Sequence, residues 1–355
     1  MADDTDGWGG TNTETEDGQT VNELMNRLEQ LRDEEEERDE RTDEGVLLDQ
    51  LDEVEQRLLA FGEALGGRPG DVTDLPFTEE AGLDHMPEPL YVRHDTEMLN
   101  QVTSWLLQDQ HIGLVSPYGT GKSAFREIVL RDLSKHDGFV VTYLDNPRET
   151  TARTLYQTIL EAAYGAGYSL DLRRYSQVRN GIPWATAEAK SAVHEIVGRV
   201  RRDDRTLLLV VDEIEVLTAD LLSPLQVAGD AGVRLFLTGT PEGKRRVAEV
   251  RATLDSRLRY YQHIDPFSPD DIAEYIARSF AYFRDESYAD QSPDLFTRAA
   301  IEDIHERTEG NPREVRIECR ELFTRAAFVW YRTGQDIDRI RITPELRHRR
   351  FGMGH

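Results

Sequence analysis

One short segment has the composition of a phosphate-binding loop. Residues 116–123 read Ser-Pro-Tyr-Gly-Thr-Gly-Lys-Ser and match G-x-x-x-x-G-K-[ST] except at the first position, where serine replaces glycine. Glycines let successive backbone N–H groups turn inward around phosphate oxygens, and a helix that begins there points its positive end at them. The alternative is a glycine-rich turn that ends in a surface lysine. We predict nucleotide contacts from Ser116, Pro117, Tyr118, Gly119, Thr120, Gly121, Lys122, Ser123 and Ala124.

A second segment could supply the chemistry that such a loop lacks. An apolar run from Leu207 to Val211 ends in the carboxylates of Asp212 and Glu213. Beside a phosphate loop, Lys122 is expected to meet the β- and γ-phosphates, while Ser123 and Asp212 hold Mg²⁺. Glu213 is then placed to orient and deprotonate a water molecule. An acidic pair after a strand is also typical of a helix N-terminus, and we interpret Glu215 as a surface residue.

The surrounding pattern predicts the elements that position these residues. Apolar runs alternate with helical patterns, as in a parallel sheet covered by helices. The runs are Ile112 to Val115, Phe139 to Leu144, Leu207 to Val211 and Val233 to Leu237. From Pro269 onward the apolar residues recur at helical spacing, which indicates a separate helical domain.

The order of these motifs resembles that of AAA+ ATPases, in the branch of ExeA-type secretion ATPases, transposition helper ATPases and archaeal origin-recognition initiators. The likeness runs from about Pro87 to Arg341. It implies an α/β fold with a three-layer αβα P-loop core, a parallel sheet and a small helical lid. ATP is the expected nucleotide, because the nearest guanine-type element, Ser134 to Asp137, directly follows the phosphate-loop helix.

The resemblance also implies roles for residues outside the two motifs. Thr240 is the first choice and Thr238 the second for a polar contact to the γ-phosphate or the water, although a Thr-Gly-Thr-Pro turn accounts for them equally well. Arg257 is the expected arginine finger toward a neighbouring subunit's nucleotide. Its nearby rivals are Arg251 and Arg259, and any of the three can instead form a salt bridge.

Two further sites are implied by the same resemblance. Residues 308–313, Thr-Glu-Gly-Asn-Pro-Arg, are similar to the family's sensor-2 element, which directs Arg313 back at the phosphates. A proline in a first helical turn is also ordinary on structural grounds alone. Tyr91 and Val92 lie where the family builds its adenine pocket; equally, they could be core residues.

Charge is distributed unevenly along the chain. The 355 residues carry a formal charge of −26, but residues 1–90 hold 28 Asp and Glu against 6 Arg. We predict a disordered acidic arm over 1–20, helical segments over 21–66 and a linker over 67–86. The core is expected over 87–267, the helical lid over 268–340 and a basic tail over 341–355. The N-terminal helices are candidates for a protein-interaction module.

Composition narrows the class of protein. A single cysteine excludes an intramolecular disulfide, and no segment approaches the roughly 18 apolar residues of a membrane span. We therefore expect a cytoplasmic protein without direct membrane insertion. Only 4 of its 42 basic residues are lysine, a composition similar to that of proteins from high-salt cytoplasm.

Together these patterns predict a Mg²⁺-dependent ATPase that assembles or remodels a partner, most consistent with DNA transactions. A homo-oligomer with nucleotide at its subunit interfaces is expected, with DNA or a DNA-bound protein as partner. The alternatives are a nucleotide-dependent switch or scaffold with negligible turnover, and an ATPase of a surface or secretion machine.

Overall fold

The computed structural model describes residues 51–78, 87–144, 146–288, 294–334 and 336–348. The chain divides into two compact units, Met1–Leu58 and Leu59–His355. The described part of the first unit, residues 51–58, is helical. The predicted acidic arm over 1–20 and the helical segment over 21–50 lie outside the described residues. The second unit contains the predicted sheet and the helical domain.

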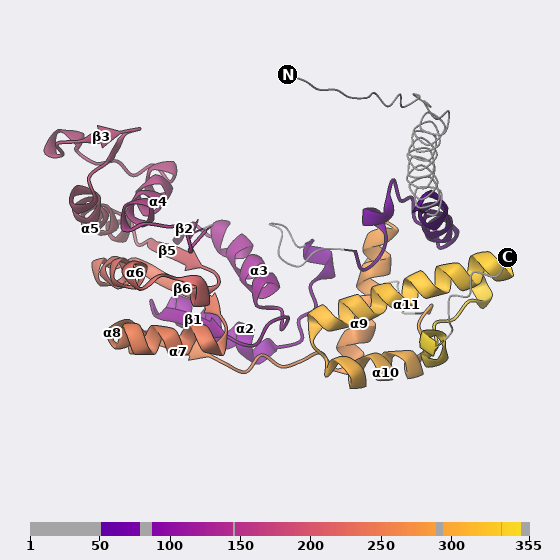
Figure 1. The fold of residues 1–355 in the computed structure, drawn as a ribbon. Coiled ribbons are helices and arrows are strands. Elements are labelled where there is room, and N and C mark those ends of the chain that lie inside the picture. Colours follow the sequence, from indigo (N-terminus) through magenta and orange to yellow (C-terminus); the bar gives the residue numbers. More distant parts are fainter. Residues whose placement is uncertain (1–50, 79–86, 145, 289–293, 335, 349–355) are drawn as a thin grey trace, which may run out of the picture. The chain divides into compact units, whose positions relative to one another are not determined.

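A five-stranded sheet of order β2-β5-β6-β1-β7 forms the centre of this unit, and every neighbouring pair is parallel (Figure 1). All four predicted apolar runs are strands of this sheet. The strands are β1 (His111–Val115), β2 (Phe139–Leu144), β5 (Thr206–Val211), β6 (Arg234–Gly239) and β7 (Leu258–Tyr261). The sequence did not reveal β7, whose Leu-Arg-Tyr-Tyr has no apolar run.

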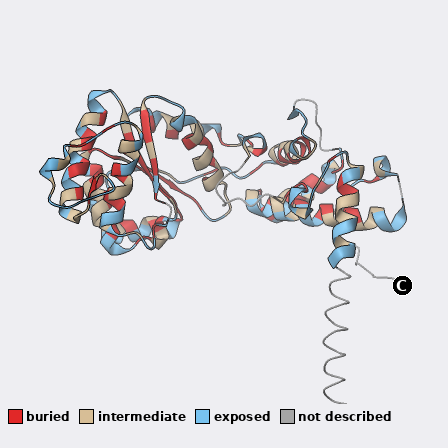
Figure 2. Ribbon diagram, turned by 90° about the horizontal axis from the view of Figure 1, so that it is seen from above, coloured by how far each residue is buried: buried red, intermediate tan, exposed pale blue. Residues whose placement is uncertain are grey.

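Helices cover both faces of the sheet, because successive side chains of a buried strand point to opposite sides. From β5, Leu207 and Leu209 pack into one cluster with α4, α5 and α6. Leu208 and Val210 pack into the other cluster, with α2 and α3. Figure 2 shows the buried strands between these layers. The predicted three-layer αβα core is confirmed.

The helices of this core begin and end close to cap residues. Thr151 caps α4 by accepting a hydrogen bond from the backbone N–H of Thr154, and Asp95 caps α2 by accepting from that of Met98. The helices are α2 (Thr96–Leu107), α3 (Lys122–Ser134), α4 (Ala152–Gly165), α5 (Thr186–Arg202), α6 (Ala219–Ala231), α7 (Pro241–Val250) and α8 (Ala252–Asp255).

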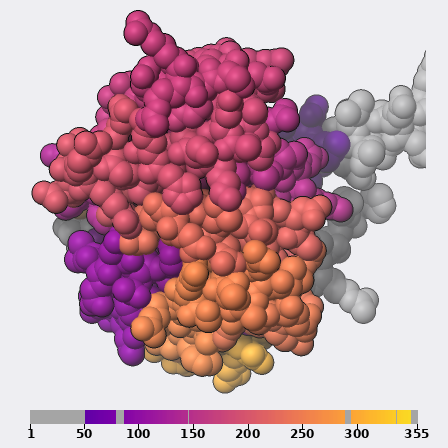
Figure 3. Space-filling view, turned by 90° about the vertical axis from the view of Figure 1, so that its left-hand side faces the viewer, coloured from indigo at the N-terminus to yellow at the C-terminus, as the bar shows by residue number. Residues whose placement is uncertain are grey.

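Short elements join these helices. An antiparallel hairpin of β3 (Val178–Arg179) and β4 (Ile182–Pro183) lies between α4 and α5 and turns through Asn180 and Gly181, both at positive φ. The 3₁₀ turns are η1 (Val72–Asp74), η2 (Glu88–Leu90), η3 (Leu172–Arg174), η4 (Ile214–Val216), η6 (Ile337–Arg339) and η7 (Pro344–His348). In Figure 3 the magenta segments of the chain, which include this hairpin, gather on one side of the orange ones.

The helical domain contains α9 (Pro269–Phe283), α10 (Arg298–Thr308) and α11 (Pro312–Thr333). Its core is aromatic: Phe77 lies edge-on to Phe280 at 5.7 Å and to Phe296 at 5.8 Å between ring centroids. Phe77 is fully buried although it belongs to the range predicted as a linker. The apolar side chains of this range therefore complete the helical domain.

The segment after α11 also packs on the helical domain. Ile342 is fully buried and forms a parallel bridge with Phe296. Arg347 pairs with Asp303 at 2.9 Å and with Glu318. In the described part of the predicted basic tail, Arg347 thus forms ion pairs within the chain. Among the described helices, none combines the length and apolarity needed to cross a bilayer.

Candidate nucleotide-binding site

A cavity of about 960 Å³ lies at the carboxyl ends of β5 and β6, beside the start of α3. Crevices outside the carboxyl ends of parallel strands are the usual ligand sites of such sheets. The lining includes most of the residues predicted from sequence, from both the sheet and the helical domain. These are Tyr91, Val92, Tyr118, Gly119, Gly121, Lys122, Ser123, Ala124, Asp212, Glu213 and Arg313.

The loop after β1 has the backbone of a phosphate cradle. Gly119 and Gly121 have φ of +82° and +88°, and Gly121 directly precedes α3. These left-handed conformations are costly for residues with a Cβ. Ser116, the departure from the glycine pattern, is not at positive φ and is almost fully buried. The serine therefore fits this position without backbone strain.

Lys122 reaches back across the loop. Its Nζ donates to the carbonyl oxygens of Ser116 at 2.7 Å and Pro117 at 2.6 Å. Burial lowers the pKa of Lys122, and the carboxylates of Glu215 and Asp212 oppose that shift. The ammonium group thus lies at the loop, hydrogen-bonded to two carbonyl oxygens that a phosphate could replace.

Asp212 follows β5, and both of its oxygens have partners. Oδ1 accepts from the Thr238 hydroxyl and from the backbone N–H of Glu213, the latter at 2.9 Å. Oδ2 forms an ion pair with Arg126, one turn after Lys122 on α3. The sequence patterns did not single out Arg126, since nothing in the loop motif specifies that position.

Glu213 and Glu215 line the same cavity but differ in surroundings. Glu213 is exposed and holds a left-handed backbone with φ of +53°. Glu215 is half-buried and accepts from the Tyr118 hydroxyl and the Thr240 backbone N–H, each at 3.0 Å. The hydrogen bond to Glu215 raises the pKa of Tyr118. The interpretation of Glu215 as a surface residue was therefore wrong: it ties β6 and the phosphate loop together.

The two threonines of the predicted sensor segment have different tasks. Thr238 is fully buried in β6, and its hydroxyl donates to Asp212. The Thr240 hydroxyl caps α7 by accepting from the backbone N–H of Gly243 at 3.3 Å. Neither threonine is among the residues that line the cavity, but Thr238 contacts Asp212, which does line it. The geometry thus favours Thr238, the second choice, over Thr240.

The predicted arginine finger lies away from this cavity. Arg257 immediately precedes β7, whose first residue pairs with the first residue of β1, at the edge of the sheet opposite the phosphate loop. It forms an ion pair with Asp230. Arg251 donates to Gln226 at 2.9 Å and Ser223 at 3.0 Å. Among the described residues, Arg251, Arg257 and Arg259 do not line this cavity.

The start of α11 lies directly on the phosphate loop. The backbone N–H of Arg313 donates to the carbonyl oxygen of Gly119 at 3.2 Å, and the Asn311 amide donates to that of Tyr118 at 3.0 Å. A Cβ on Gly119 would lie 2.4 Å from Asn311 Oδ1. Glycine is thus needed there for close approach as well as for its φ. The Arg313 side chain is exposed and lines the cavity.

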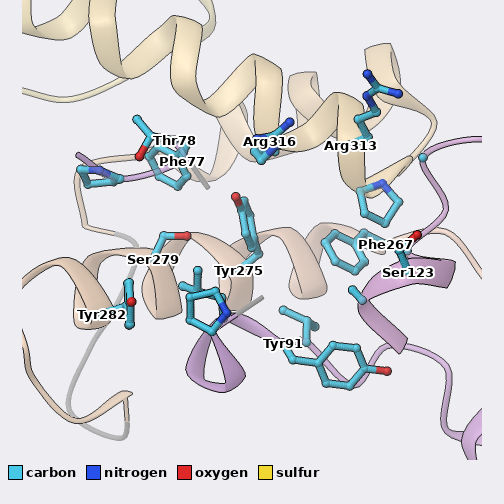
Figure 4. A pocket seen from close by; sticks show the side chains of 18 of the residues that line it. Phe77, Thr78, Tyr91, Ser123, Phe267, Tyr275, Ser279, Tyr282, Arg313 and Arg316 are labelled. Carbon is cyan, nitrogen blue, oxygen red and sulfur yellow. The ribbon is translucent and has the colours of Figure 1, made fainter. Parts of the chain in front are cut away.

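Aromatic side chains line the remainder of the cavity. His94 lies edge-on to Phe267, with ring centroids 4.7 Å apart, and Phe267 is followed by Tyr275 at 6.3 Å. Figure 4 shows Phe267 and Tyr275 directed into the space between α9 and α11. Desolvation raises the pKa of Tyr91 to about 12, so its hydroxyl stays protonated. These surfaces suit a flat base.

The residues present fit an adenine nucleotide with a divalent cation. The glycine cradle and Lys122 suit phosphates, and the oxygens of Ser123 and Asp212 are the donor type that Mg²⁺ prefers. His94 Nε2 and Ser279 Oγ line the cavity, are buried and have no hydrogen-bond partner among the described residues. Buried polar atoms are normally satisfied, so these two point to a polar ligand.

Comparison with known proteins found one family model and several similar solved structures. Residues 106–247 match the family model described as the AAA domain. Similar solved structures include Cdc6p from Pyrobaculum aerophilum, 16% identical with a TM-score of 0.47, covering 77% of this chain and 71% of that one. The Aeropyrum pernix ORC2 protein in its ADPNP-ADP complexes is 15% identical with a TM-score of 0.47, covering 75% and 68%.

A third similar structure is the Walker-type ATPase paby2304 of Pyrococcus abyssi, 13% identical with a TM-score of 0.42, covering 71% of this chain and 72% of that one. No curated protein matches by sequence. The family match spans the phosphate loop and the acidic pair of β5. Residues 106–247 are therefore similar in sequence to the AAA domain.

Proposed function

We propose that this chain is a Mg²⁺-dependent ATPase that couples ATP binding and hydrolysis to the assembly or remodelling of a partner. The observation that carries the proposal is the convergence of Lys122, Ser123, Asp212 and Glu213 on one cavity at the start of α3. Two of these residues come from the phosphate loop and two from the end of β5. Phosphoryl transfer is catalysed mainly by such positioning and charge.

In this proposal each residue has one task in the reaction. Lys122 would exchange its carbonyl partners for the β- and γ-phosphate oxygens, and Ser123 and Asp212 would hold the cation. Bound Mg²⁺ would offset the negative charge of the phosphates. The Glu213 carboxylate accepts a proton from water as the water oxygen bonds to the γ-phosphorus. The bond from that phosphorus to the bridging oxygen breaks, and ADP and phosphate leave.

Binding at this loop is tested by Lys122→Ala, with Lys135→Ala as the matched control. Lys135 is an exposed residue that follows α3 and does not line the cavity. Loss of the loop lysine is expected to weaken ATP binding about tenfold or more, as befits a charged hydrogen bond worth about 1.5–3 kcal/mol. A fluorescent ATP analogue measures both variants. Equal affinity in the two variants would overturn the placement of the phosphates.

A role for neighbouring subunits follows from the position of Arg257. Since this arginine is remote from the cavity of its own chain, we infer that it acts on the nucleotide of an adjacent copy in a homo-oligomer. Mixing Glu213→Gln with Arg257→Ala tests this inference, because each variant supplies what the other lacks. A mixture that turns over ATP faster than either variant alone supports action between subunits. A mixture whose turnover is only the mean of the two variants contradicts this inference.

A nucleotide-dependent switch with negligible turnover is the second candidate. It is favoured by the direct hydrogen bond from Arg313 to Gly119, through which the helical domain can read the state of the loop without hydrolysis. Turnover measured against protein concentration separates the two. Flat, negligible turnover with tight ATP binding favours the switch.

We further infer that the partner is DNA or a protein bound to DNA. One surface that suits DNA phosphates lies at the β3–β4 hairpin, where Arg153 and Arg179 flank the Trp184 ring at 5.3 Å and 4.3 Å. Anisotropy of labelled DNA across a salt series tests this surface with Arg153→Ala/Arg179→Ala and the exposed Arg202→Ala as control. A smaller salt dependence in the double variant alone is expected. If the double variant and the unmodified protein bind DNA equally at every salt concentration, this surface does not bind DNA.

A further inference from the structure

Arg126 and Asp212 form an ion pair at the place where the proposed function needs a cation. Arg126 lies on α3 and Asp212 at the end of β5, and their side chains are 21% and 27% exposed. Arg126 is three residues after Ser123, so both lie on the same face of the helix. The guanidinium thus contacts Asp212, one of the two residues that would hold Mg²⁺.

Both oxygens of the Asp212 carboxylate have a partner while this pair persists, and a guanidinium charge lies against Oδ2. Oδ1 accepts from the Thr238 hydroxyl and from the Glu213 backbone, and Oδ2 is paired with Arg126. The first two partners belong to β6 and to the backbone, and they orient the carboxylate. Arg126 is the partner that carries a positive charge. Its side chain is long enough for the guanidinium to move away from Asp212.

The guanidinium itself is not saturated. Its Nε is buried and has no hydrogen-bond partner among the described residues. A guanidinium offers several N–H donors in a plane and suits phosphate oxygens. Arg126 also lines the cavity that holds the phosphate loop. An incoming phosphate would therefore find a donor beside the loop.

We propose that Arg126 is a resident counter-ion of Asp212, which competes with the divalent cation and moves to phosphate oxygens when the cation enters. The inference rests on the proposed function, because it needs a nucleotide and a metal at this cavity. It has two consequences. Removing the guanidinium tightens metal binding, since a positive charge no longer opposes it, and it weakens nucleotide binding without metal.

The test is Mn²⁺ binding to the full chain with ADP, read as free Mn²⁺ by electron paramagnetic resonance. Arg126→Gln is compared with the unmodified protein and with Arg131→Gln. Arg131 is on the same helix and pairs with Glu127 at 3.2 Å and Glu88 at 3.5 Å, away from the loop. We expect Arg126→Gln to bind Mn²⁺ about tenfold more tightly and metal-free ADP several-fold more weakly, with Arg131→Gln unchanged.

Each outcome decides between roles. A purely structural tie between α3 and β5 predicts lower thermal stability with Mn²⁺ affinity unchanged or weaker, and that result overturns the proposal. If Arg126→Gln does not fold, Arg126→Met keeps the apolar stem, and Arg126→Lys keeps the charge and should retain weak Mn²⁺ binding. An unmodified protein that binds no ADP would instead refute the proposed function, and the inference with it.

Discussion

The backbone N–H of Arg313 donates to the carbonyl oxygen of Gly119 at 3.2 Å, which joins the first turn of α11 to the phosphate loop. The same turn is capped by Asn311, whose side chain accepts from two backbone N–H groups and donates to Tyr118. Asn311 therefore caps the start of α11 and also contacts the phosphate loop of the core. This contact makes the helical domain part of the candidate nucleotide site.

Replacing Asn311 by alanine should remove both functions of its side chain. We expect the loss of a helix cap to cost about 1 kcal/mol in the free energy of unfolding. Nucleotide affinity should also fall several-fold, because the loop loses its amide contact. Thr151→Ala removes a cap of α4 that does not line the cavity. Equal losses of stability with equal ATP affinity in the two variants would show that Asn311 is only a cap.

Gly310 should not tolerate a side chain. Its φ is +71°, and a Cβ there would lie 2.2 Å from the carbonyl oxygen of Phe267. Gly310→Ala combines backbone strain with a backbone clash and is expected to destabilise the fold by about 2–4 kcal/mol. Gly334 has φ of +58°, and a Cβ added there would meet nothing within 4 Å, so Gly334→Ala should cost about 1 kcal/mol.

Urea unfolding of the two glycine variants measures that difference. Because both positions are left-handed, strain alone predicts equal losses. A larger loss at Gly310 assigns the excess to the close approach of Phe267. Equal midpoints would mean that the two backbones separate when the methyl group is added.

The two threonines of the sensor segment should separate catalysis from capping. Thr238→Val removes the hydroxyl that orients Asp212, and we expect kcat to fall about tenfold or more. Thr240→Val removes the cap of α7 and should act mainly on stability, by about 1 kcal/mol. Steady-state turnover and thermal unfolding of both variants check this. A larger fall in kcat for Thr240→Val would restore Thr240 as the sensor.

Stability should decrease below neutral pH because of His111. Burial, followed by the charges of Arg234 and Arg257, lowers its pKa to about 4. Its Nδ1 accepts from the backbone N–H of Leu235 at 3.2 Å. As the pH falls, His111 takes up a proton near pH 6.5 in the unfolded chain but only near pH 4 in the folded chain. The contribution of His111 to the free energy of unfolding is therefore complete above about pH 6.5 and is lost as the pH falls toward about 4.

From pH 7.5 to pH 5 this histidine should remove about 2 kcal/mol from the free energy of unfolding. Urea unfolding at the two pH values, for the unmodified protein and His111→Gln, isolates its share from that of the carboxylates. Between the two pH values, the free energy of unfolding should fall by about 2 kcal/mol more in the unmodified protein than in His111→Gln. Parallel losses in both proteins would mean that His111 titrates normally in the fold.

The sequence predicted the parts of the fold that have local signals. Strand β5 is buried on both faces, so its sequence is a continuous apolar run. The phosphate-loop motif predicts a strand before the loop and a helix after the loop. By contrast, β7 contains Arg259 and two tyrosines, and is a strand only because it pairs with β1. Phe77 lies in a polar stretch, and its burial depends on helices distant in sequence.

The sequence predicted those residues of the candidate site that belong to one short motif with fixed spacing. Lys122 and Ser123 follow from the loop, and Asp212 and Glu213 from the end of β5. Arg126 and Glu215 line the cavity, and Asn311 contacts the phosphate loop, through contacts between elements that are distant in sequence, which no single segment encodes. The sensor choice between Thr238 and Thr240 required knowing which hydroxyl was already used for capping.

The most direct test of the central claim compares ATP binding and hydrolysis by Glu213→Gln with those of the unmodified protein. Glu161→Gln, an exposed residue of α4, is the control. We predict that Glu213→Gln binds ATP with unchanged affinity and loses turnover by about 10²-fold or more, as expected for removal of a general base. Unchanged turnover in Glu213→Gln, with ATP bound, would contradict the claim that this cavity hydrolyses ATP.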